Sequence, residues 1–331
     1  MKTKATITGL GAYLPEKVLT NQDLERMVDT SDEWITTRTG MKERRIAAKH
    51  EFTSDMGFEA AKQALQAANL KPDSIDLILF ATLTPDYLFP STACLIQAKL
   101  EAKCAAAVDI QAACTGFIYA LSMAKAYIQS GMYQKVLVVS SEKLSSIVDY
   151  QDRSTCVLFG DGAAACVVEA DKEGLTIDHV NLGCDGTKAE LIKLPAGGSK
   201  MPASEETVRN RAHYLQMEGR EIYKNAVRRM EISIKDCMQA MNIEEEAIGW
   251  LIPHQANMRI IESLAKRFRV PEDRVFLTIH KYGNTSASSV GIALHELVCK
   301  KTVTDQERVM LVAFGAGLTF GAALLTYEGN Q

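Results

Sequence analysis

The 331-residue sequence has no apolar run of 18 residues, and its start, MKTKATITGLGAYLP, lacks a long apolar stretch. A membrane-spanning helix needs about 20 apolar residues, so we expect neither such a helix nor a signal peptide. A basic excess is also missing, since Lys and Arg number 37 against 41 Asp and Glu, for a formal net charge of −4. Nucleic-acid binders are usually basic, so no nucleic-acid partner is expected, and an acidic partner would need a local basic patch.

Cysteine is present, with eight residues, but never in the arrangements of metal sites or redox pairs. No C-x-x-C pair occurs, and no cluster of Cys and His has zinc-site spacing, so no metal is expected. Most of the cysteines lie in apolar runs, as Cys166 does before VVEA, where buried and inert thiols are usual. We therefore expect reduced cysteines and a cytoplasmic location.

Short apolar runs alternate with longer helical patterns along the chain, which is typical of α/β proteins with helices on both faces of a sheet. Helices are predicted at 54–70 and 220–242. Near-continuous apolar runs predict buried strands at 75–83, 105–110, 135–142, 249–254, 274–279 and 308–314.

The chain contains a weak internal repeat. KVLVVSSE leads to FGDGAAACVVEA, and RVMLVAF leads to FGAGLTFGAALLTYE; each is a buried strand, a glycine-rich turn and a strand of small residues. Strand, loop and helix also follow one another in VDIQAACTGFIYALSMAKAYI and in FLTIHKYGNTSASSVGIALHELV. The repeat predicts two similar halves, 1–170 and 171–331, which meet where DKEG interrupts the pattern.

Cys114 lies in VDIQAACTGFIYAL, where a predicted strand ending at Ile110 gives way to a predicted helix. A thiol on a first helical turn is close to exposed N–H groups and the positive end of the helix dipole, which favour the thiolate. Ala112, Ala113 and Gly116 add little bulk, so a substrate could approach closely. The alternative is a buried cysteine at an ordinary helix start.

Two polar residues follow other predicted strands. His254, in LIPHQANMRIIESLAKRF, lies at the carboxyl edge of a strand, where open α/β sheets gather their ligand sites. Asn284, in HKYGNTSASSVGIAL, precedes a helix and occupies the second-half counterpart of the Cys114 junction. If the halves stack with pseudo-twofold symmetry, Cys114 and Asn284 face each other. The alternatives are a structural histidine and an asparagine that caps the helix.

Three motifs, AACTGF, PHQAN and GNTSAS, occur in this order. They resemble the Cys, His and Asn motifs of the β-ketoacyl-acyl-carrier-protein synthase III family of condensing enzymes, and the similarity extends from TGLGAYLPEKVLTN to FGAGLTFGAALL. Asparagine as the third residue argues for the Cys-His-Asn branch, because elongating synthases have a second histidine there and thiolases a second cysteine. The GFGPG signature of chalcone-synthase-like enzymes is missing, since the chain reads AFGAGLTFG. The resemblance implies a thiolase-like α/β fold whose two similar halves stack as a five-layer α-β-α-β-α arrangement.

The resemblance also implies a reaction. An acyl-CoA primer, with acetyl-CoA expected and other acyl groups left open, condenses with malonyl-acyl-carrier-protein to give 3-ketoacyl-carrier, CO₂ and coenzyme A, which starts type II fatty-acid synthesis. Cys114 would hold the acyl group covalently, and His254 and Asn284 would stabilise the enolate left by decarboxylation. The backbone N–H groups of Cys114 and Ala316 would bind the oxyanion; many relatives have glycine where Ala316 stands, but a backbone donor tolerates alanine. No cofactor is required, since the coenzyme A thioester is a substrate.

A short helix is predicted within DTSDEWITTRTGMKERR. Thr30 and Glu33 have capping-box spacing, Gly40 is a plausible stop, and Trp34 and Arg38 share a face. Unaided, this pattern is typical of a surface helix with a half-buried tryptophan.

In the family the matching tryptophan stacks on the adenine of coenzyme A. An arginine covers the other side of that adenine, and Arg153 in YQDRSTCVLFGDGA fits its position. The other matched contacts are Thr30 and Arg38 on the nucleotide and Gly219 and Asn257 along the pantetheine tunnel.

Acyl carrier protein is acidic, so this chain would need a basic surface to bind it. The family places that surface at the helix after His254, where the basic residues are Arg259, Lys266 and Arg267, with Lys224 on another predicted helix. The alternative is an ordinary solvated helix face.

Phe89, before Pro90 in PDYLFP, matches a family phenylalanine that reaches into the partner subunit's acyl pocket. A homodimer is therefore implied. The alternative is a loop whose aromatic residues anchor the core.

Three other functions stay open at this point. They are a related Cys-His-Asn ketosynthase of a specialised lipid or polyketide pathway, a non-catalytic acyl-thioester-binding or scaffold protein, and a cysteine hydrolase. The complete set of Cys114, His254 and Asn284 argues against the scaffold.

Overall fold

The computed structural model describes residues 3–300 and 303–329. Its strands are β1 (Ala5–Tyr13), β2 (Lys17–Thr20), β3 (Glu43–Ile46), β4 (Leu77–Ala81), β5 (Ala106–Ile110), β6 (Lys135–Glu142), β7 (Gly162–Ala170), β8 (Gly174–Cys184), β9 (Ile192–Lys193), β10 (Gln216–Met217), β11 (Trp250–Pro253), β12 (Arg308–Gly315) and β13 (Thr319–Glu328). Its helices are α1 (Asn21–Glu25), α2 (Asp32–Thr39), α3 (Thr53–Ala67), α4 (Thr92–Leu100), α5 (Gly116–Gln129), α6 (Arg153–Cys156), α7 (Glu205–Arg209), α8 (Gly219–Met241), α9 (Met258–Arg267), α10 (Ile279–Tyr282) and α11 (Ser288–Lys300).

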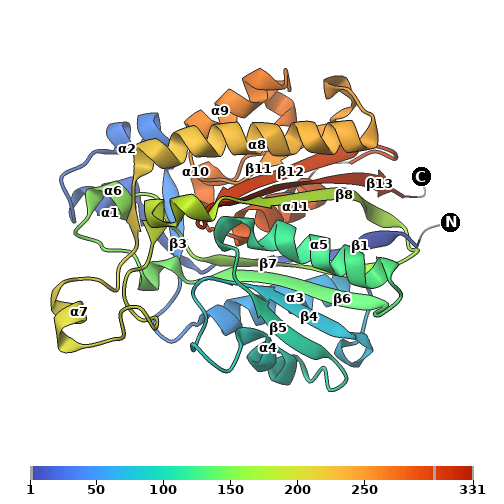
Figure 1. Cartoon of the computed structure of the whole chain (residues 1–331), viewed down its shortest axis with the longest axis horizontal. Helices are drawn as coiled ribbons and strands as arrows, with labels where there is room; N and C mark the ends of the chain where they lie inside the picture. Colours follow the sequence, from blue (N-terminus) through green and yellow to red (C-terminus); the bar gives the residue numbers. More distant parts are fainter. Residues whose placement is uncertain (1–2, 301–302, 330–331) are drawn as a thin grey trace.

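A nine-stranded mixed sheet runs in the order β11-β12-β13-β8-β1-β7-β6-β4-β5. Strands β4, β5 and β6 are parallel to one another, as are β11 and β12. The carboxyl ends of parallel strands meet at one edge, and ligand sites of α/β sheets gather there. Figure 1 shows helices α8 and α9 above the sheet, α5 and α11 in the middle, and α3 and α4 below.

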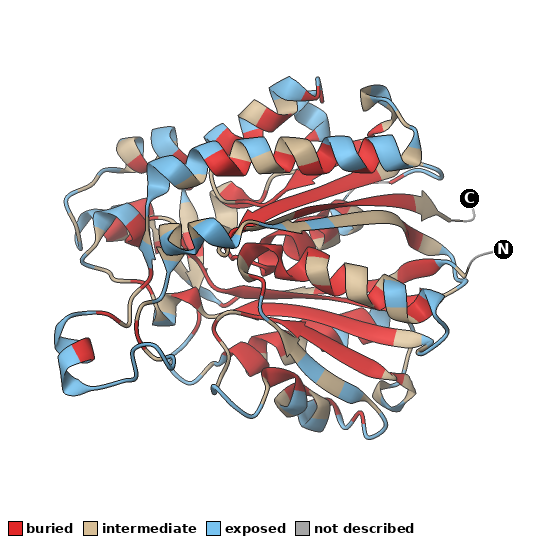
Figure 2. Cartoon of the chain, in the orientation of Figure 1, coloured by how far each residue is buried: buried red, intermediate tan, exposed pale blue. Residues whose placement is uncertain are grey.

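Alternation along the strands divides the interior into three cores. Successive side chains of a strand point to opposite faces, so Leu77 and Leu79 of β4 pack with α5, whereas Ile78 and Phe80 pack with α3 and α4. Strands β12 and β13 likewise send alternate residues toward α8 and α9 or toward α5 and α11. Figure 2 shows the buried strands between helices whose outer faces are exposed. The result is the predicted order of layers, α-β-α-β-α.

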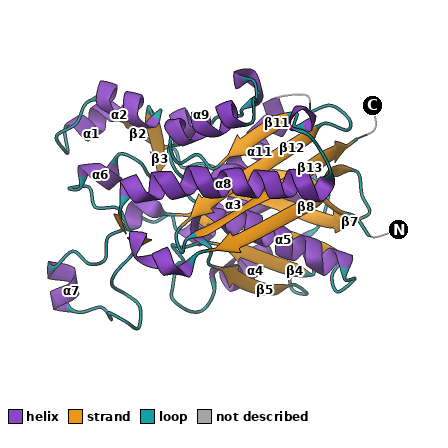
Figure 3. Ribbon diagram, turned by 45° about the horizontal axis from the view of Figure 1, so that its top comes forward, coloured by secondary structure: helices purple, strands orange, loops and turns teal. Residues whose placement is uncertain are grey.

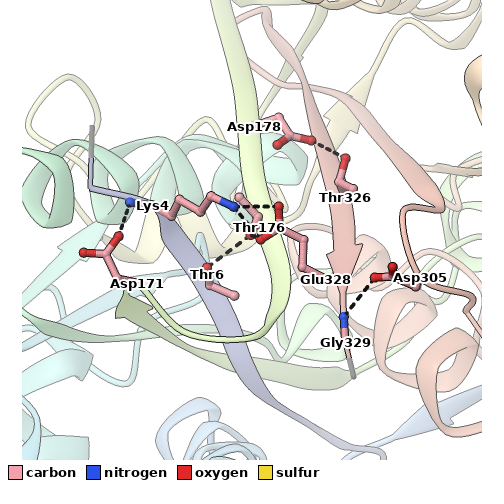
Figure 4. Close-up of polar contacts among 9 residues, drawn as sticks. All are labelled: Lys4, Thr6, Asp171, Thr176, Asp178, Asp305, Thr326, Glu328 and Gly329. Atoms are coloured by element: carbon pink, nitrogen blue, oxygen red, sulfur yellow. Dashed lines mark hydrogen bonds and ion pairs between the residues drawn. The ribbon is translucent and has the colours of Figure 1, made fainter. Parts of the chain in front are cut away.

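The two sets of strands join where β1 meets β8, over only two residue pairs, one of which is Thr6 with Thr176. Their hydroxyls are 3.2 Å apart, and Thr176 also donates to Glu328 over 3.1 Å. Lys4 also spans this junction: its Nζ forms an ion pair with Glu328 at 2.8 Å, and its backbone N–H donates to Asp171 Oδ1 at 2.8 Å (Figure 4). The predicted boundary between residues 170 and 171 falls in the turn from β7 to β8, and the division into halves stays a prediction.

One predicted strand is wrong. Residues 274–279 form no strand; Val275 makes a single bridge to Leu251, and Ile279 already begins α10. The Gln255 side chain accepts the N–H groups of Thr278 and Ile279 at 2.9 and 3.1 Å, so a side chain satisfies backbone that a strand would pair. The segment is apolar because it is buried, not because it belongs to the sheet.

The other predicted elements agree with the structure. Strands 135–142 and 308–314 correspond to β6 and β12, and helices 54–70 and 220–242 to α3 and α8. Figure 3 shows α8 lying across the sheet and α7 standing away from it. Within the described ranges, no helix combines the length and apolar character needed to cross a membrane.

Candidate active site

Cys114 lies in a tight turn after β5. A single 3₁₀ turn, Ala113–Thr115, precedes α5, and Ala113 has a positive φ of 44°. The end of β12 approaches this turn so closely that a Cβ on Gly315 would lie 2.7 Å from the Cys114 nitrogen. A Cβ on Gly116 would lie 2.9 Å from the Cβ of Ala81. Small residues therefore let the ends of β4 and β12 meet at the Cys114 turn.

The structure brings Cys114, His254 and Asn284 together on one cavity of about 170 Å³. Their exposed fractions are 8%, 2% and 6%, so all three side chains are nearly withdrawn from solvent. His254 follows the end of β11, and Asn284 is held beside Phe159 by a bridge. The same cavity is lined by Gly219, Asn257 and Ala316.

Cys114 also borders a second cavity, of about 530 Å³. Its lining is largely apolar and includes Leu83, Leu144, Phe159 and Leu215. Cys114 therefore lies between a cavity that contains the polar candidates and another that suits an acyl chain.

His254 is held as a neutral hydrogen-bond donor. Burial lowers the pKa of His254 to about 3, so the ring carries one proton. Ser289 Oγ lies 2.6 Å from Nδ1 and accepts the N–H of Gln255 over 3.4 Å, which leaves the serine proton free to be donated to Nδ1. In the tautomer that accepts this proton, the ring proton is on Nε2, which has no hydrogen-bond partner among the described residues.

Asn284 does not cap the helix that follows it. Helix α11 begins at Ser288, and Asn284 Oδ1 instead accepts the N–H of Ser286 over 2.8 Å. Its backbone donates to Leu158 O at 2.9 Å. The Nδ2 amide has no partner in the part of the chain that the structure describes, so it remains available as a donor.

Burial raises the pKa of the Cys114 thiol to about 12, with Ser286 opposing the shift and Glu142 adding to it. The sequence predicted a thiolate favoured by the helix start, but burial of the thiol opposes that effect and raises its pKa. Burial also raises the pKa of Cys156 to about 11 and that of Cys237 to about 12. Cys114 differs from them in bordering both cavities, rather than in acidity.

The predicted nucleotide residues gather around Trp34. The guanidinium carbons of Arg153 and Arg38 lie 5.1 and 5.8 Å from its ring centroid, although Arg153 is distant in sequence. The predicted capping residue is wrong by one position: Ser31, not Thr30, accepts the N–H of Trp34 over 3.1 Å. A β-region serine directly before Asp32 fits the N-cap geometry.

The helix stop and the tunnel residues take clear positions. Gly40 ends α2 in the left-handed conformation, with φ 80°, as predicted. Asn257 caps α9, accepting the N–H of Arg259 over 2.9 Å, and its amide donates to Arg38 O over 3.2 Å. Gly219 begins α8. Asn257 thus links the Trp34 helix to the cavity at Cys114.

The predicted basic residues lie on α8 and α9, which Tyr223 and Ser263 connect over 3.2 Å. Lys224 pairs with Glu221 at 2.7 Å, and Arg267 pairs with Glu231 at 2.8 Å. Arg259 and Lys266 are exposed and have no ion pair within residues 3–300 and 303–329. Among the four predicted basic residues, these two are therefore the cations most available to an acidic partner.

Phe89 does not anchor the core. It is 86% exposed, and its neighbours Tyr87 and Leu88 are 60% and 83% exposed. The reading of PDYLFP as a core-anchoring loop is therefore wrong. Leu88 borders the second cavity, so this apolar loop lies beside the predicted acyl site.

Sequence reasoning missed Ser286, Ser289 and Glu142. The two serines belong to the run of small residues after Asn284, which reads equally well as helix-start chemistry. Glu142 is the last residue of a predicted buried strand, and a carboxylate in a buried strand was the signal that could have identified it. Among the described residues, no group of three or more His, Cys, Asp or Glu side chains is placed to hold a metal ion.

Sequence profiles of 3-oxoacyl-(acyl-carrier-protein) synthase III match residues 108–186 and, for the C-terminal part, 238–327. A beta-ketoacyl-(acyl-carrier-protein) synthase III of Chlamydia muridarum is 58% identical over 323 residues, which are 97% of this chain and 99% of that protein. The crystal structure of 3-oxoacyl-(acyl-carrier-protein) synthase III from Aquifex aeolicus has a TM-score of 0.90 and 50% identity, covering 98% of this chain and 100% of that one. The priming beta-ketosynthase of a polyketide pathway has a TM-score of 0.91 and 33% identity, covering 99% and 98%.

Proposed function

The chain belongs to the β-ketoacyl-acyl-carrier-protein synthase III family, and on that premise we propose that Cys114, His254 and Asn284 carry out its condensation. The chain is a thiolase-fold condensing acyltransferase that starts fatty-acid synthesis. We further propose that it joins an acyl-CoA primer, acetyl-CoA in the first instance, to malonyl-acyl-carrier-protein. The observation that carries this assignment is the position of Cys114 between two cavities, with His254 and Asn284 beside it.

In the first half-reaction the sulfur of Cys114 attacks the thioester carbonyl of the primer, and coenzyme A leaves. The acyl group then extends into the apolar cavity lined by Leu83, Leu144 and Phe159. Covalent capture splits one difficult condensation into two easier steps. The low exposure of Cys114 keeps bulk water from the acyl-enzyme, which would otherwise be hydrolysed.

In the second half-reaction, malonyl-carrier loses CO₂ and leaves an enolate. His254 Nε2–H and the Asn284 amide donate hydrogen bonds to the oxygen on which this charge develops. Because both donors are fixed and buried, they need little reorganisation when the charge appears. The enolate carbon then attacks the acyl-Cys114 carbonyl.

The oxyanion of that attack is bound by the backbone N–H groups of Cys114 and Ala316. Neither N–H is used by another residue in the described part of the chain. Gly315 allows the two backbones to approach, since a Cβ there would meet the Cys114 nitrogen at 2.7 Å.

Coenzyme A binds with its adenine at Trp34, between that ring and Arg153, and with Thr30 and Arg38 on the nucleotide. Both arginines already lie over the Trp34 ring, so the cationic and aromatic groups for a purine and its phosphates are assembled. The pantetheine arm passes Gly219 and Asn257 on its way to Cys114, since both line the cavity that Cys114 borders.

Acyl carrier protein binds over Arg259, Lys266, Arg267 and Lys224. Charge reversal at Arg259 and Lys266 should raise the KM for malonyl-carrier and weaken its salt dependence, while acylation by acyl-CoA stays unchanged. Lys62→Glu, on α3 in the opposite outer layer, is the matched control. An unchanged KM and salt dependence in the double variant would contradict this docking surface.

Two properties of the assembly complete the proposal. The protein acts as a cytoplasmic homodimer without a cofactor, with no nucleic-acid or membrane partner, and Phe89 enters the partner subunit's acyl pocket. The exposure of Phe89, at 86%, supports a contact outside this chain.

The test is intact-mass measurement of the wild-type protein with acetyl-CoA, followed by malonyl-carrier. One acetyl group should appear and then disappear as 3-ketoacyl-carrier forms. Cys114→Ala should gain none, whereas Cys166→Ala, which removes a buried thiol in β7, should behave as wild type. Loss of the acetyl group to water at the same rate without malonyl-carrier would instead identify a hydrolase.

A further inference from the structure

Glu142 is a buried carboxyl group outside the set of Cys114, His254 and Asn284. It ends β6 and has no exposed surface. Its Oε2 atom accepts hydrogen bonds from Thr82 Oγ1 and Leu83 N at 3.0 Å and from Thr84 Oγ1 at 2.9 Å. Its Oε1 atom has no hydrogen-bond partner in the described chain. A buried charge without a cation is costly, so a half-satisfied carboxylate at the sheet edge calls for a physical reason.

The hydroxyl of Ser286 is the second unsatisfied group. It is buried, and no hydrogen bond of normal geometry reaches its Oγ within the described residues. Yet this hydroxyl acts on both neighbours, since it lowers the pKa of the Cys114 thiol and that of the Glu142 carboxyl. Ser286 therefore lies within interaction range of both Cys114 and Glu142.

The backbone holds Ser286 in this place. Its φ is +51°, a left-handed conformation that serine seldom adopts, and its N–H is bonded to Asn284 Oδ1 over 2.8 Å. Ser286 and Cys114 border the same cavity of about 530 Å³. Strain of this kind persists only where the surroundings impose it, and it gathers at functional sites.

The acylation step needs a base that His254 does not supply. The Cys114 thiol must lose its proton before or during attack on the primer. His254 is neutral, and its Nδ1 is engaged with Ser289, while its low pKa makes the ring a poor proton acceptor.

We propose that Glu142 takes up the Cys114 proton through the Ser286 hydroxyl when the primer acylates the enzyme. The thiol proton moves to Ser286 Oγ as the hydroxyl proton of Ser286 moves to Glu142 Oε1. The Cys114 S–H bond breaks, a Glu142 O–H bond forms, and Ser286 ends unchanged. The thiolate then bonds to the primer carbonyl carbon, and coenzyme A leaves as a thiolate that takes a proton from solvent.

The proton returns at the end of the cycle. Attack of the enolate on acyl-Cys114 expels the Cys114 thiolate, and Glu142 then gives its proton back through Ser286. The buried site thus carries one negative charge both before and after each transfer, so the thiolate never forms beside a charged carboxylate. Ser286 exchanges a proton directly with the reacting sulfur, whereas Glu142 acts on that sulfur only through Ser286.

The other charged or titratable groups near this site are engaged elsewhere. Lys143, next to Glu142, donates to the carbonyls of Ala48 and Glu51. Asp161 accepts from Ser145 and Ala47, and buried Arg44 donates to Asn21 and Val157. Glu142 is the one charged group that acts on the pKa of Cys114 among the described residues.

Burial raises the pKa of Glu142 to about 7. The proton acceptor is the ionised form, so the single-turnover rate of acetylation should rise with pH through about 7 and then level off in the wild type. A variant without the acceptor should lose this inflection and instead show a rate that keeps rising with pH, because only the spontaneously ionised thiol reacts.

The test measures acetylation of Cys114 by acetyl-CoA across pH, using rapid quenching and intact mass. Glu142→Gln keeps the size of the side chain and an acceptor for Leu83, and should acylate about 100-fold more slowly near pH 8 with no inflection. Ser286→Ala and Ser286→Gly remove the hydroxyl and should show the same loss. Ser288→Ala removes another buried hydroxyl that lacks a partner, four residues beyond Asn284, and should match the wild type.

Wild-type rates and an unchanged pH inflection in Glu142→Gln would overturn the proposal. If Glu142→Gln fails to fold, the Ser286 variants decide it by the same criteria. The inference rests on the proposed role of Cys114, and the two can fail separately. If Cys114→Ala is still acetylated, Cys114 is not the nucleophile and the proposed function fails. If Cys114→Ala is not acetylated but Glu142→Gln is acetylated normally, only the proton relay fails.

Discussion

Replacing Asn284 separates a catalytic role of its side chain from a structural one. Asn284→Ala removes two things at once: the Oδ1 acceptor for the Ser286 N–H, at 2.8 Å, and the Nδ2 donor that has no partner within the described chain. The lost acceptor should lower the free energy of unfolding by about 1 kcal/mol. The lost donor should slow condensation by about 100-fold to 1,000-fold, the cost of removing one preorganised oxyanion donor.

The assay isolates condensation from acylation. The enzyme is first acetylated with acetyl-CoA, freed of excess reagent and mixed with malonyl-carrier, and the loss of the acetyl group is followed by intact mass. Asn284→Ala should still gain its acetyl group and then lose it slowly, whereas Ser288→Ala should do both as the wild type does. Condensation at the wild-type rate, accompanied only by a lower Tm, would refute the donor role and leave a structural asparagine.

Three further predictions concern the histidine, the nucleotide site and the buried carboxylate. Ser289→Ala should slow condensation about tenfold without slowing acylation, because neutral His254 loses the partner that keeps its proton on Nε2. Ser289→Thr, which keeps the hydroxyl, should restore the rate of condensation. Equal losses of rate in both half-reactions would contradict this prediction. Trp34→Ala should raise the KM for acetyl-CoA about tenfold, since one stacking contact is lost, but leave the KM for acetyl-pantetheine, which lacks adenine, unchanged. Between the ordinary pKa of 4.5 and the raised value of about 7, folded Glu142 keeps a proton that the unfolded chain releases, so its contribution to stability falls as pH rises. In denaturant titrations, the free energy of unfolding of Glu142→Gln should therefore rise by about 3 kcal/mol relative to that of the wild type as the pH increases across that range. Stability curves of the two proteins that run parallel with pH would contradict this prediction.

The sequence predicted correctly those helices and strands whose structure depends on residues within one segment. The strand at 135–142 and the helix at 220–242 follow from runs and periodicities within one segment, and they agree with β6 and α8. The segment 274–279 has the same apolar character, but Gln255, a residue distant in sequence, satisfies its backbone. The composition of residues 274–279 alone therefore does not distinguish a sheet strand from a buried loop.

The candidate site also has features that the sequence predicts and features that depend on the folded structure. The motifs around Cys114, His254 and Asn284 were visible as sequence, and the structure brings these residues to one cavity. The acidity of Cys114 was not predictable, because it depends on how completely the folded chain excludes solvent from the thiol. The partnership of Ser289 with His254 spans 35 residues and follows only from the packing of α11 against the end of β11.

The central claim is that Cys114 carries the acyl group, and the position of the label tests it most directly. Acetyl-CoA labelled in its acetyl group is added to the wild-type protein, which is then quenched at low pH and digested, and the peptides are sequenced by mass spectrometry. The label should be found on the peptide that contains VDIQAACTGF, at Cys114, and should leave that peptide when malonyl-carrier is added. A label on any other of the eight cysteines that malonyl-carrier removes at the rate of turnover would contradict the account.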